Sequence, residues 1–170
     1  MCCTVPGIDQ TDVQKQSNRP CRHCGSGCGV YDTRPGVCRE FFCAWRYFAA
    51  WDDAWRPDRS GVFARIETSP ESGELALNIM LIDRPVEIAE APWFVERMAA
   101  LAAAEVPVYL GLPGPPGCLP IRVRLTREAL ILALQRNAIP ALLKNAITFM
   151  QAQPVKPHVL SHSGNDLTGP

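Results

Sequence analysis

The chain has no excess charge of either sign, because 17 Lys and Arg balance 17 Asp and Glu among its 170 residues. Without a net field, little attracts it to a phosphate backbone or an anionic membrane, so we expect neither a nucleic-acid nor a membrane partner. It also lacks an apolar run of the roughly 20 residues that a spanning helix needs, and its start lacks the basic and apolar blocks of a signal peptide. These absences predict a cytoplasmic protein.

Residue sets typical of catalysis are lacking as well. No Ser, His and Asp set and no pair of carboxylates stands out. The glycine-rich stretch GSGCG (25–29) neither follows a predicted strand nor opens a predicted helix, and it has no lysine, so it is not typical of a phosphate loop. The three histidines, His23, His158 and His162, are not expected to be ligands. These absences favour a non-catalytic role.

Cysteine, by contrast, is abundant and gathered at one end of the chain. Seven of the eight cysteines lie within the first 43 residues: Cys2, Cys3, Cys21, Cys24, Cys28, Cys38 and Cys43. Clustered thiols in a reducing compartment hold metal or carry out redox chemistry more often than they form disulfides. A disulfide framework is the alternative, but small secreted scaffolds of that kind usually lack a large cysteine-poor second half.

The spacing of these cysteines is typical of metal ligands. Cys21 and Cys24 have the two-residue separation used for structural zinc, and the three-residue separation of Cys24 and Cys28 lies within the usual range. Seven thiolates exceed the four that one zinc ion or one iron–sulfur cluster takes, so either two metals bind or some cysteines are spare. Nearby arginines either offset thiolate charge or pair with surface carboxylates. They are Arg19, Arg22, Arg34, Arg39 and Arg46, and the carboxylates are Asp32, Glu40, Asp52 and Asp53.

Residues 21–45, CRHCGSGCGVYDTRPGVCREFFCAW, resemble a bacterial cysteine-rich family of zinc- or iron-chelating proteins related to the flagellin lysine methylase group. In that family a Cys-x-x-Cys-Cys motif precedes this segment. Cys2 and Cys3 match its last two cysteines, and its first has no counterpart here. The resemblance covers about residues 1–60, including WRPDRS at 55–60, and implies metal binding through the seven clustered cysteines. It does not imply methyl transfer, because no nucleotide-binding glycine loop accompanies it.

Two functions follow from these observations. The first is a metal-binding protein in which zinc or iron holds the N-terminal loops together, with a role in chelation, metal handling or partner binding. The alternative is an iron–sulfur cluster that serves a redox or methylase-like reaction. A zinc-ribbon nucleic-acid binder is a weaker third hypothesis, because the chain has no net positive charge.

The composition divides the chain into three parts. Residues 1–59 form a cysteine-rich metal-binding module, 60–153 an α+β body, and 154–170 a tail rich in Ser, Gly and Pro that we expect to be disordered. Within the first part, the spacing predicts a helix over 37–55 that presents an aromatic face to the core. The aromatic residues concerned are Phe41, Trp45, Phe48 and Trp55.

The body contains two predicted hairpins, each followed by helices. The first joins GVFARIE (61–67) to ELALNIMLI (74–82), and the second joins VPVYLGL (106–112) to CLPIRVRLT (118–126), which places Cys118 on a strand as a buried apolar residue. Pro92 begins a helix that ends near 105, Thr126 caps a helix through 137, and another helix runs from about 140 to 153. The order ββαββα predicts an α+β fold, a small antiparallel sheet with helices on one face.

Overall fold

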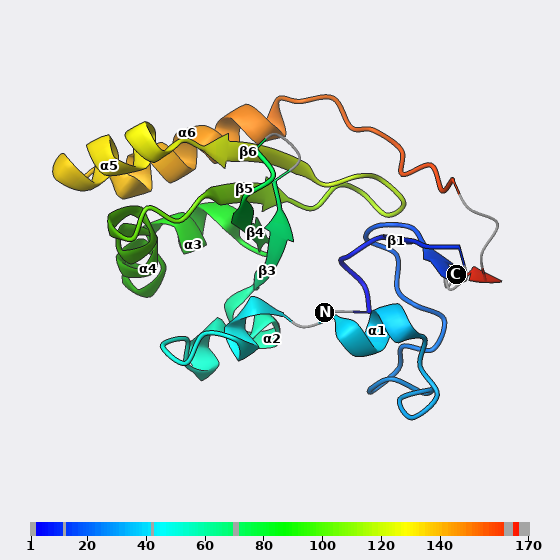
Figure 1. The fold of residues 1–170 in the computed structure, drawn as a ribbon. Helices are drawn as coiled ribbons and strands as arrows, with labels where there is room; N and C mark the ends of the chain where they lie inside the picture. The colour runs from blue at the N-terminus through cyan, green and yellow to red at the C-terminus, as the bar shows by residue number, and fades with distance from the viewer. Residues whose placement is uncertain (1–2, 12, 42, 70–71, 162–164, 167–170) are drawn as a thin grey trace. The chain divides into compact units, whose positions relative to one another are not determined.

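The chain folds into two compact units in a computed structural model that describes residues 3–11, 13–41, 43–69, 72–161 and 165–166 (Figure 1). The cysteine unit comprises 1–43, 113–120 and 154–170, and the helix–sheet unit comprises 44–112 and 121–153. This division differs from the three consecutive parts that the composition predicts. Residues 44–59 join the helix–sheet unit because Ala44, Trp51 and Trp55 are buried in its core.

A four-stranded sheet forms the centre of the helix–sheet unit. Its strands follow the order β3 (Val62–Thr68), β4 (Leu75–Leu81), β5 (Val108–Leu112) and β6 (Ile121–Leu125). The two outer pairs are the antiparallel hairpins that the sequence predicts. The central pair, β4 and β5, is parallel, because a helical connection carries the chain back to the start of the sheet. The α+β class is confirmed, with one parallel pairing added to the expected antiparallel ones.

The helices of this unit begin where the sequence sets their caps. Proline is the first residue of α2 (Pro57–Ser60), α3 (Pro85–Glu90) and α4 (Pro92–Ala103), where its missing N–H costs no hydrogen bond. Before α5 (Arg127–Gln135), the Thr126 hydroxyl accepts a hydrogen bond from the Ala129 amide at 3.2 Å. A further helix, α6, spans Ile139–Gln151. The three predicted helices of the body are confirmed, and α3 was not predicted.

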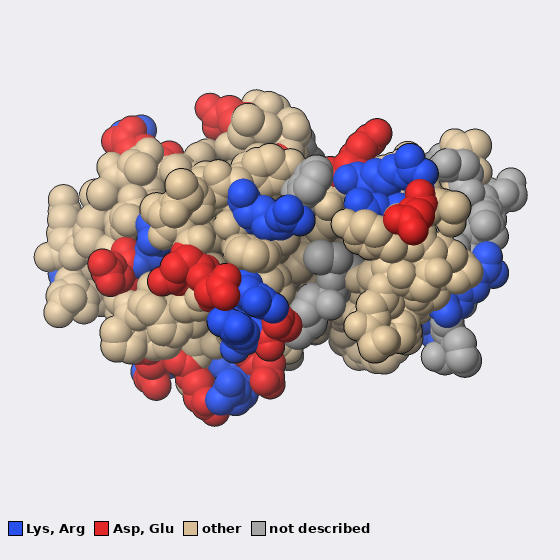
Figure 2. Space-filling model, turned by 90° about the horizontal axis from the view of Figure 1, so that it is seen from below, with Lys and Arg blue, Asp and Glu red and all other residues tan. Residues whose placement is uncertain are grey.

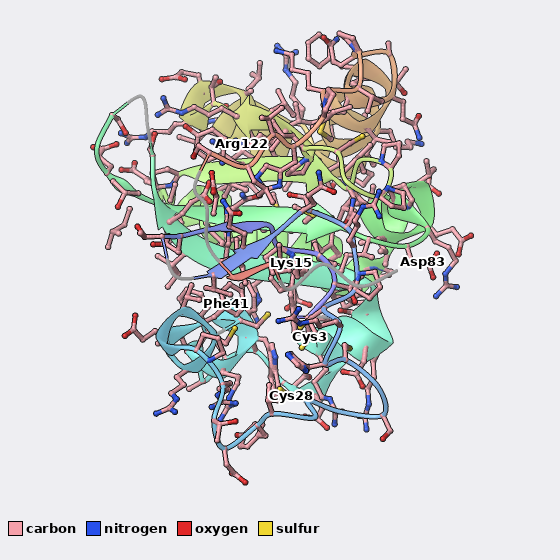
Figure 3. The ribbon with its side chains drawn as sticks, turned by 90° about the vertical axis from the view of Figure 1, so that its right-hand side faces the viewer. Cys3, Lys15, Cys28, Phe41, Asp83 and Arg122 are labelled. Carbon is pink, nitrogen blue, oxygen red and sulfur yellow. The ribbon has the colours of Figure 1, made fainter. Side chains whose placement is uncertain are left out.

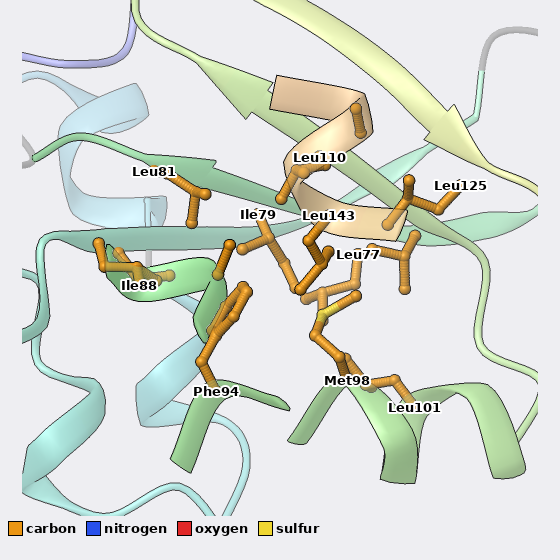
Figure 4. Packing of buried hydrophobic residues seen from close by; sticks show 14 of the residues in the cluster. Leu77, Ile79, Leu81, Ile88, Phe94, Met98, Leu101, Leu110, Leu125 and Leu143 are labelled. Atoms are coloured by element: carbon orange, nitrogen blue, oxygen red, sulfur yellow. The ribbon is translucent and has the colours of Figure 1, made fainter. Parts of the chain in front are cut away.

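The core lies between one face of this sheet and the helices. Leu77, Val108 and Leu125 form a row across three strands, and Ile79 and Leu110 form the next row. Against these rows pack residues of all four longer helices, including Phe94 and Met98 of α4 and Leu143 of α6 (Figure 4). The helices and this face of the sheet together enclose a hydrophobic core that belongs to the helix–sheet unit.

The predicted helix over 37–55 is wrong. The chain instead forms three short pieces, α1 (Gly36–Glu40), η1 (Ala44–Arg46) and η2 (Asp53–Trp55). Phe41 is extended after α1, and the Asp52 carboxylate accepts a hydrogen bond from the Ala54 amide, which begins a new turn rather than continuing a helix. The aromatic residues still serve the core: Trp51 and Trp55 are buried, and their ring centroids lie 4.2 Å apart.

The cysteine unit is built mostly of turns around a small sheet. Its strands follow the order β1 (Ile8–Asp9), β2 (Val13–Lys15) and β7 (Asn165–Asp166), with β2 antiparallel to β1 and parallel to β7. The structure differs from the expected disordered tail, because Lys156, His158 and Ser161 have backbone hydrogen bonds to the rest of the unit and β7 pairs with β2. Residues 162–164 and 167–170, including His162, lie outside the described residues.

None of the helices in the described residues is both long enough and apolar enough to cross a membrane. On the face shown in Figure 2, acidic and basic side chains are interspersed over the surface. The view agrees with the balanced composition and offers no extended basic surface on this face.

Candidate metal centre

Three separate segments bring five cysteines together in the cysteine unit. The first carries Cys3, the second is the turn-rich loop with Cys21, Cys24 and Cys28, and the third is α1 with Cys38. The backbone joins the first two segments, because the Cys21 amide donates to the Cys3 carbonyl at 2.8 Å. Within the loop, the Cys24 amide donates to the Cys21 carbonyl at 2.8 Å, and Cys24 and Cys28 form an antiparallel bridge.

The Cys3 thiol interacts electrostatically with three other cysteines. Burial is the largest cause that raises its pKa, to about 11. Repulsion by thiolate charge at Cys24 and Cys28 raises the pKa further, as do a hydrogen bond with Cys24 and the charge of Cys21. Figure 3 shows Cys3 and Cys28 in this part of the cysteine unit.

Cys38 belongs to the same electrostatic group. Burial again is the main cause that raises the pKa of its thiol, and the charges of Cys21 and Cys28 raise it as well. Two cations oppose this effect, Arg34 and Lys15, which lower the pKa of Cys38. Five thiols from three segments therefore repel one another as thiolates, and only a nearby positive charge can keep several of them ionised together.

Lys15 supplies a positive charge inside this group. The residue is only 1% exposed, and its ammonium donates to the carbonyls of Thr4 at 2.9 Å, Gln16 at 3.1 Å and Arg19 at 2.8 Å. Burial lowers the pKa of Lys15 to about 8, while the cysteine charges raise it, Cys21 and Cys3 most. The role of Lys15 is not predictable from the sequence, because a lysine in a short polar segment carries no signal that it is buried.

The loop 113–120 and the tail hold the backbone that follows Lys15. The Gly117 amide donates to the Ser17 carbonyl at 2.8 Å, and the His158 amide donates to the Gly117 carbonyl at 2.9 Å. The Ser17 amide in turn donates to Nδ1 of His158 at 3.0 Å. The His158 ring lies directly against Gly7, where a Cβ atom would come within 2.3 Å of Cε1. His158 is thus a structural residue of this unit.

The other predicted residues fall in several places. Cys2 lies outside the described residues, and Cys43 is buried, 4% exposed, at the end of the unit. Cys118 is half-buried and lies in the loop before β6, so the expectation of a buried strand residue is wrong. It joins this unit instead, through a bridge with Pro157 in the tail. His23 is half-buried and receives a hydrogen bond from Arg22 at 3.4 Å.

The arginines divide between the two predicted roles. Arg34 lowers the pKa of Cys38, as expected for a residue that offsets thiolate charge. Arg39 instead donates to the backbone carbonyls of Arg34 and Asp32. Asp53 pairs with Arg56 and Arg59 within the helix–sheet unit rather than with an arginine of the cysteine segment.

In the described part of the chain the cysteines are free thiols, and they are not yet arranged as the ligands of one metal ion. None of its seven cysteines is in a disulfide bond, and no three of its His, Cys, Asp or Glu side chains already surround one point as metal ligands do. The chemistry of the donor set nevertheless fits a thiophilic ion such as zinc or iron, since sulfur donors dominate it. Gly25 and Gly27, with open space around them, leave the loop room to adjust.

No protein family, curated protein or solved structure matches the chain. The resemblance of residues 1–60 to the cysteine-rich chelating family therefore stays a prediction.

Proposed function

We propose that the cysteine unit binds a thiophilic metal ion, zinc or iron, and that the protein acts in metal chelation or metal handling. The ligands are drawn from Cys3, Cys21, Cys24, Cys28 and Cys38. The observation that supports this most directly is the convergence of these five thiols from three segments, four of which interact with the buried ammonium of Lys15. Cys2 and Cys43 remain further candidates from the sequence.

The electrostatics of the thiols support a cationic ligand. Burial and the charges of neighbouring cysteines raise the pKa of Cys3 and of Cys38, which favours the protonated thiols at these two positions. A divalent cation removes this repulsion, because it binds thiolates and releases their protons. Four thiolates satisfy one tetrahedral ion, which leaves one of the five for exchange or for a second ion.

The test is metal and acid-labile sulfide analysis on anaerobically purified protein, with its visible spectrum, for the wild type and two variants. We expect a stoichiometric metal ion in the wild type and in Cys118→Ser, which alters a cysteine of the same unit outside the cluster. The double variant Cys3→Ser/Cys21→Ser leaves three of the five thiols, and we expect it to lose most of its metal.

Two results would contradict the proposal. Wild-type metal content in the double variant would show that the cluster is not the binding site. Iron with matching sulfide and a brown colour would replace chelation by the iron–sulfur alternative, with a redox or methylase-like role.

A further inference from the structure

Lys15 differs from the other two lysines of the chain in its surroundings. Lys144 and Lys156 are exposed side chains, as lysines usually are. Lys15 is almost fully buried, and each of its three N–H groups has its own carbonyl acceptor. Burying a cation costs free energy unless hydrogen bonds and nearby negative charge compensate it.

Two of the three carbonyls lie near cysteines in the sequence, and the third belongs to Gln16, the residue after Lys15. Thr4 follows Cys3, and Arg19 lies two residues before Cys21, so the ammonium joins the two cysteine-bearing segments. If the ammonium were removed, three carbonyl oxygens would point at one buried place without a donor. Lys15 therefore fixes the backbone next to two of the five thiols.

The same ammonium acts on the charge of the cluster. Four thiolates around a divalent ion leave two negative charges, and a fixed positive charge beside them lowers the cost of burying that excess. Its interaction partners are Cys21, Cys3, Cys38 and Cys24, which is four of the five clustered cysteines. Arg34 also acts on this group, through Cys38.

We propose that Lys15 is the built-in countercation of the metal site: its carbonyl-held ammonium positions the loops of Cys3 and Cys21 and favours coordination by four thiolates over fewer. The inference rests on the proposed metal binding. It assigns Lys15 a positioning and charge-balancing role and leaves all coordination to sulfur. Removing the charge should lower the affinity for the metal and reduce the number of thiolates that bind it.

The experiment compares metal-free, reduced full-length wild type with Lys15→Met, which keeps the length of the side chain and removes its charge. Lys156→Met, an exposed lysine of the same unit, is the matched control. Zinc affinity is measured by chelator competition, and cobalt binding by the thiolate-to-cobalt charge-transfer absorbance, which scales with the number of coordinated thiolates. We expect Lys15→Met to bind both ions about 10- to 100-fold more weakly and with less charge-transfer absorbance per bound cobalt.

A loss of packing alone would not lower the absorbance per bound cobalt, so this readout separates the two roles. Equal affinity and equal absorbance in Lys15→Met and Lys156→Met would overturn the inference while leaving metal binding intact. A wild type that binds neither ion through thiolates would instead refute the proposed function, and the inference with it.

A second measurement uses the wild type alone and decides the matter if Lys15→Met does not fold. With lysine side chains labelled by 15N, a buried and hydrogen-bonded ammonium gives a slowly exchanging NMR signal, and Lys156→Met aids its assignment among three lysines. We expect zinc to shift this signal and to slow its hydrogen exchange further. A Lys15 signal that saturating zinc leaves unchanged would overturn the inference.

Discussion

A buried thiol must lose its proton before it can bind a metal, which makes binding by the cysteine unit depend on pH. Because burial and neighbouring thiolates raise the pKa of Cys3 to about 11 and raise that of Cys38 as well, both are protonated at neutral pH. Zinc must then displace both protons, and each displaced proton makes the apparent affinity rise by about tenfold per pH unit. We predict an affinity at least roughly 100-fold higher at pH 7.5 than at pH 6.5.

Proton release in weakly buffered solution measures the same effect directly. The wild type should release at least two protons per zinc, and Cys3→Ser, which has one thiol fewer to deprotonate, should release about one fewer. Zinc binding without proton release would mean that the thiols are already ionised in the metal-free protein.

At this scale, residue type and spacing pointed to the thiols but not to their surroundings. Thiols are recognisable because clustered cysteines have few other uses in a reducing compartment. The roles of Lys15 and His158 could not be predicted from residue type, because burial decides the first and a hydrogen bond between distant segments decides the second. His158 and its partner Ser17 are 141 residues apart.

Among the elements of the cysteine unit, the docked tail segment 154–161 depends on the absence of a side chain at Gly7. A Cβ atom there would lie 2.3 Å from Cε1 of His158 and 2.6 Å from Oγ of Ser17. We predict that Gly7→Ala displaces the His158 ring and destabilises the docked tail by about 1–3 kcal/mol. Hydrogen exchange at the Ser17 and His158 amides, which are both hydrogen-bonded in this contact, should speed up accordingly.

Gly25→Ala is the control, because the added Cβ at Gly25 meets no atom within 4 Å. Exchange at the Ser17 and His158 amides should stay at the wild-type rate in this variant. Unchanged exchange in Gly7→Ala as well would show that the ring can move aside without loosening the tail.

The elements with regular periodicity and clear caps were predictable, and the short helical turns and the tail were not. The hairpins of the helix–sheet unit and its three predicted helices follow alternation, proline positions and the Thr126 cap. The prediction of a helix over 37–55 was wrong because it relied on the helical spacing of the aromatic residues. The Asp52 side chain, which begins a new turn, was not considered as a cap. The prediction for the tail was wrong because its order comes from backbone hydrogen bonds, which its polar composition does not indicate.

The whole molecule combines a unit with its own hydrophobic core and a unit in which the buried polar side chains of Gln14, Lys15 and Ser17 lie beside partly exposed thiols. We therefore predict that removal of the metal acts on one unit only. With a chelator present, amide protection should fall over 3–41, 113–120 and 154–161, whereas the strands and helices of the helix–sheet unit should keep theirs.

Hydrogen exchange followed by mass spectrometry, with and without chelator, distinguishes these segments in one experiment. Residues 113–120 and 154–161 are the informative ones, because a metal module confined to 1–59 would leave them unaffected. Equal loss of protection in both units would show that they unfold together, and no loss in either would show that the cysteine unit is stable without metal.

Membership in the cysteine unit also has a consequence for how the protein is made. The clustered cysteines of this unit are synthesised before the helix–sheet unit, whereas β7 and His158 of the same unit are synthesised after it. A nascent chain therefore carries its thiols through the synthesis of the entire helix–sheet unit before their surroundings can close. Until then the thiols are open to oxidation, and the ions that the chain encounters during translation compete for the proposed metal site.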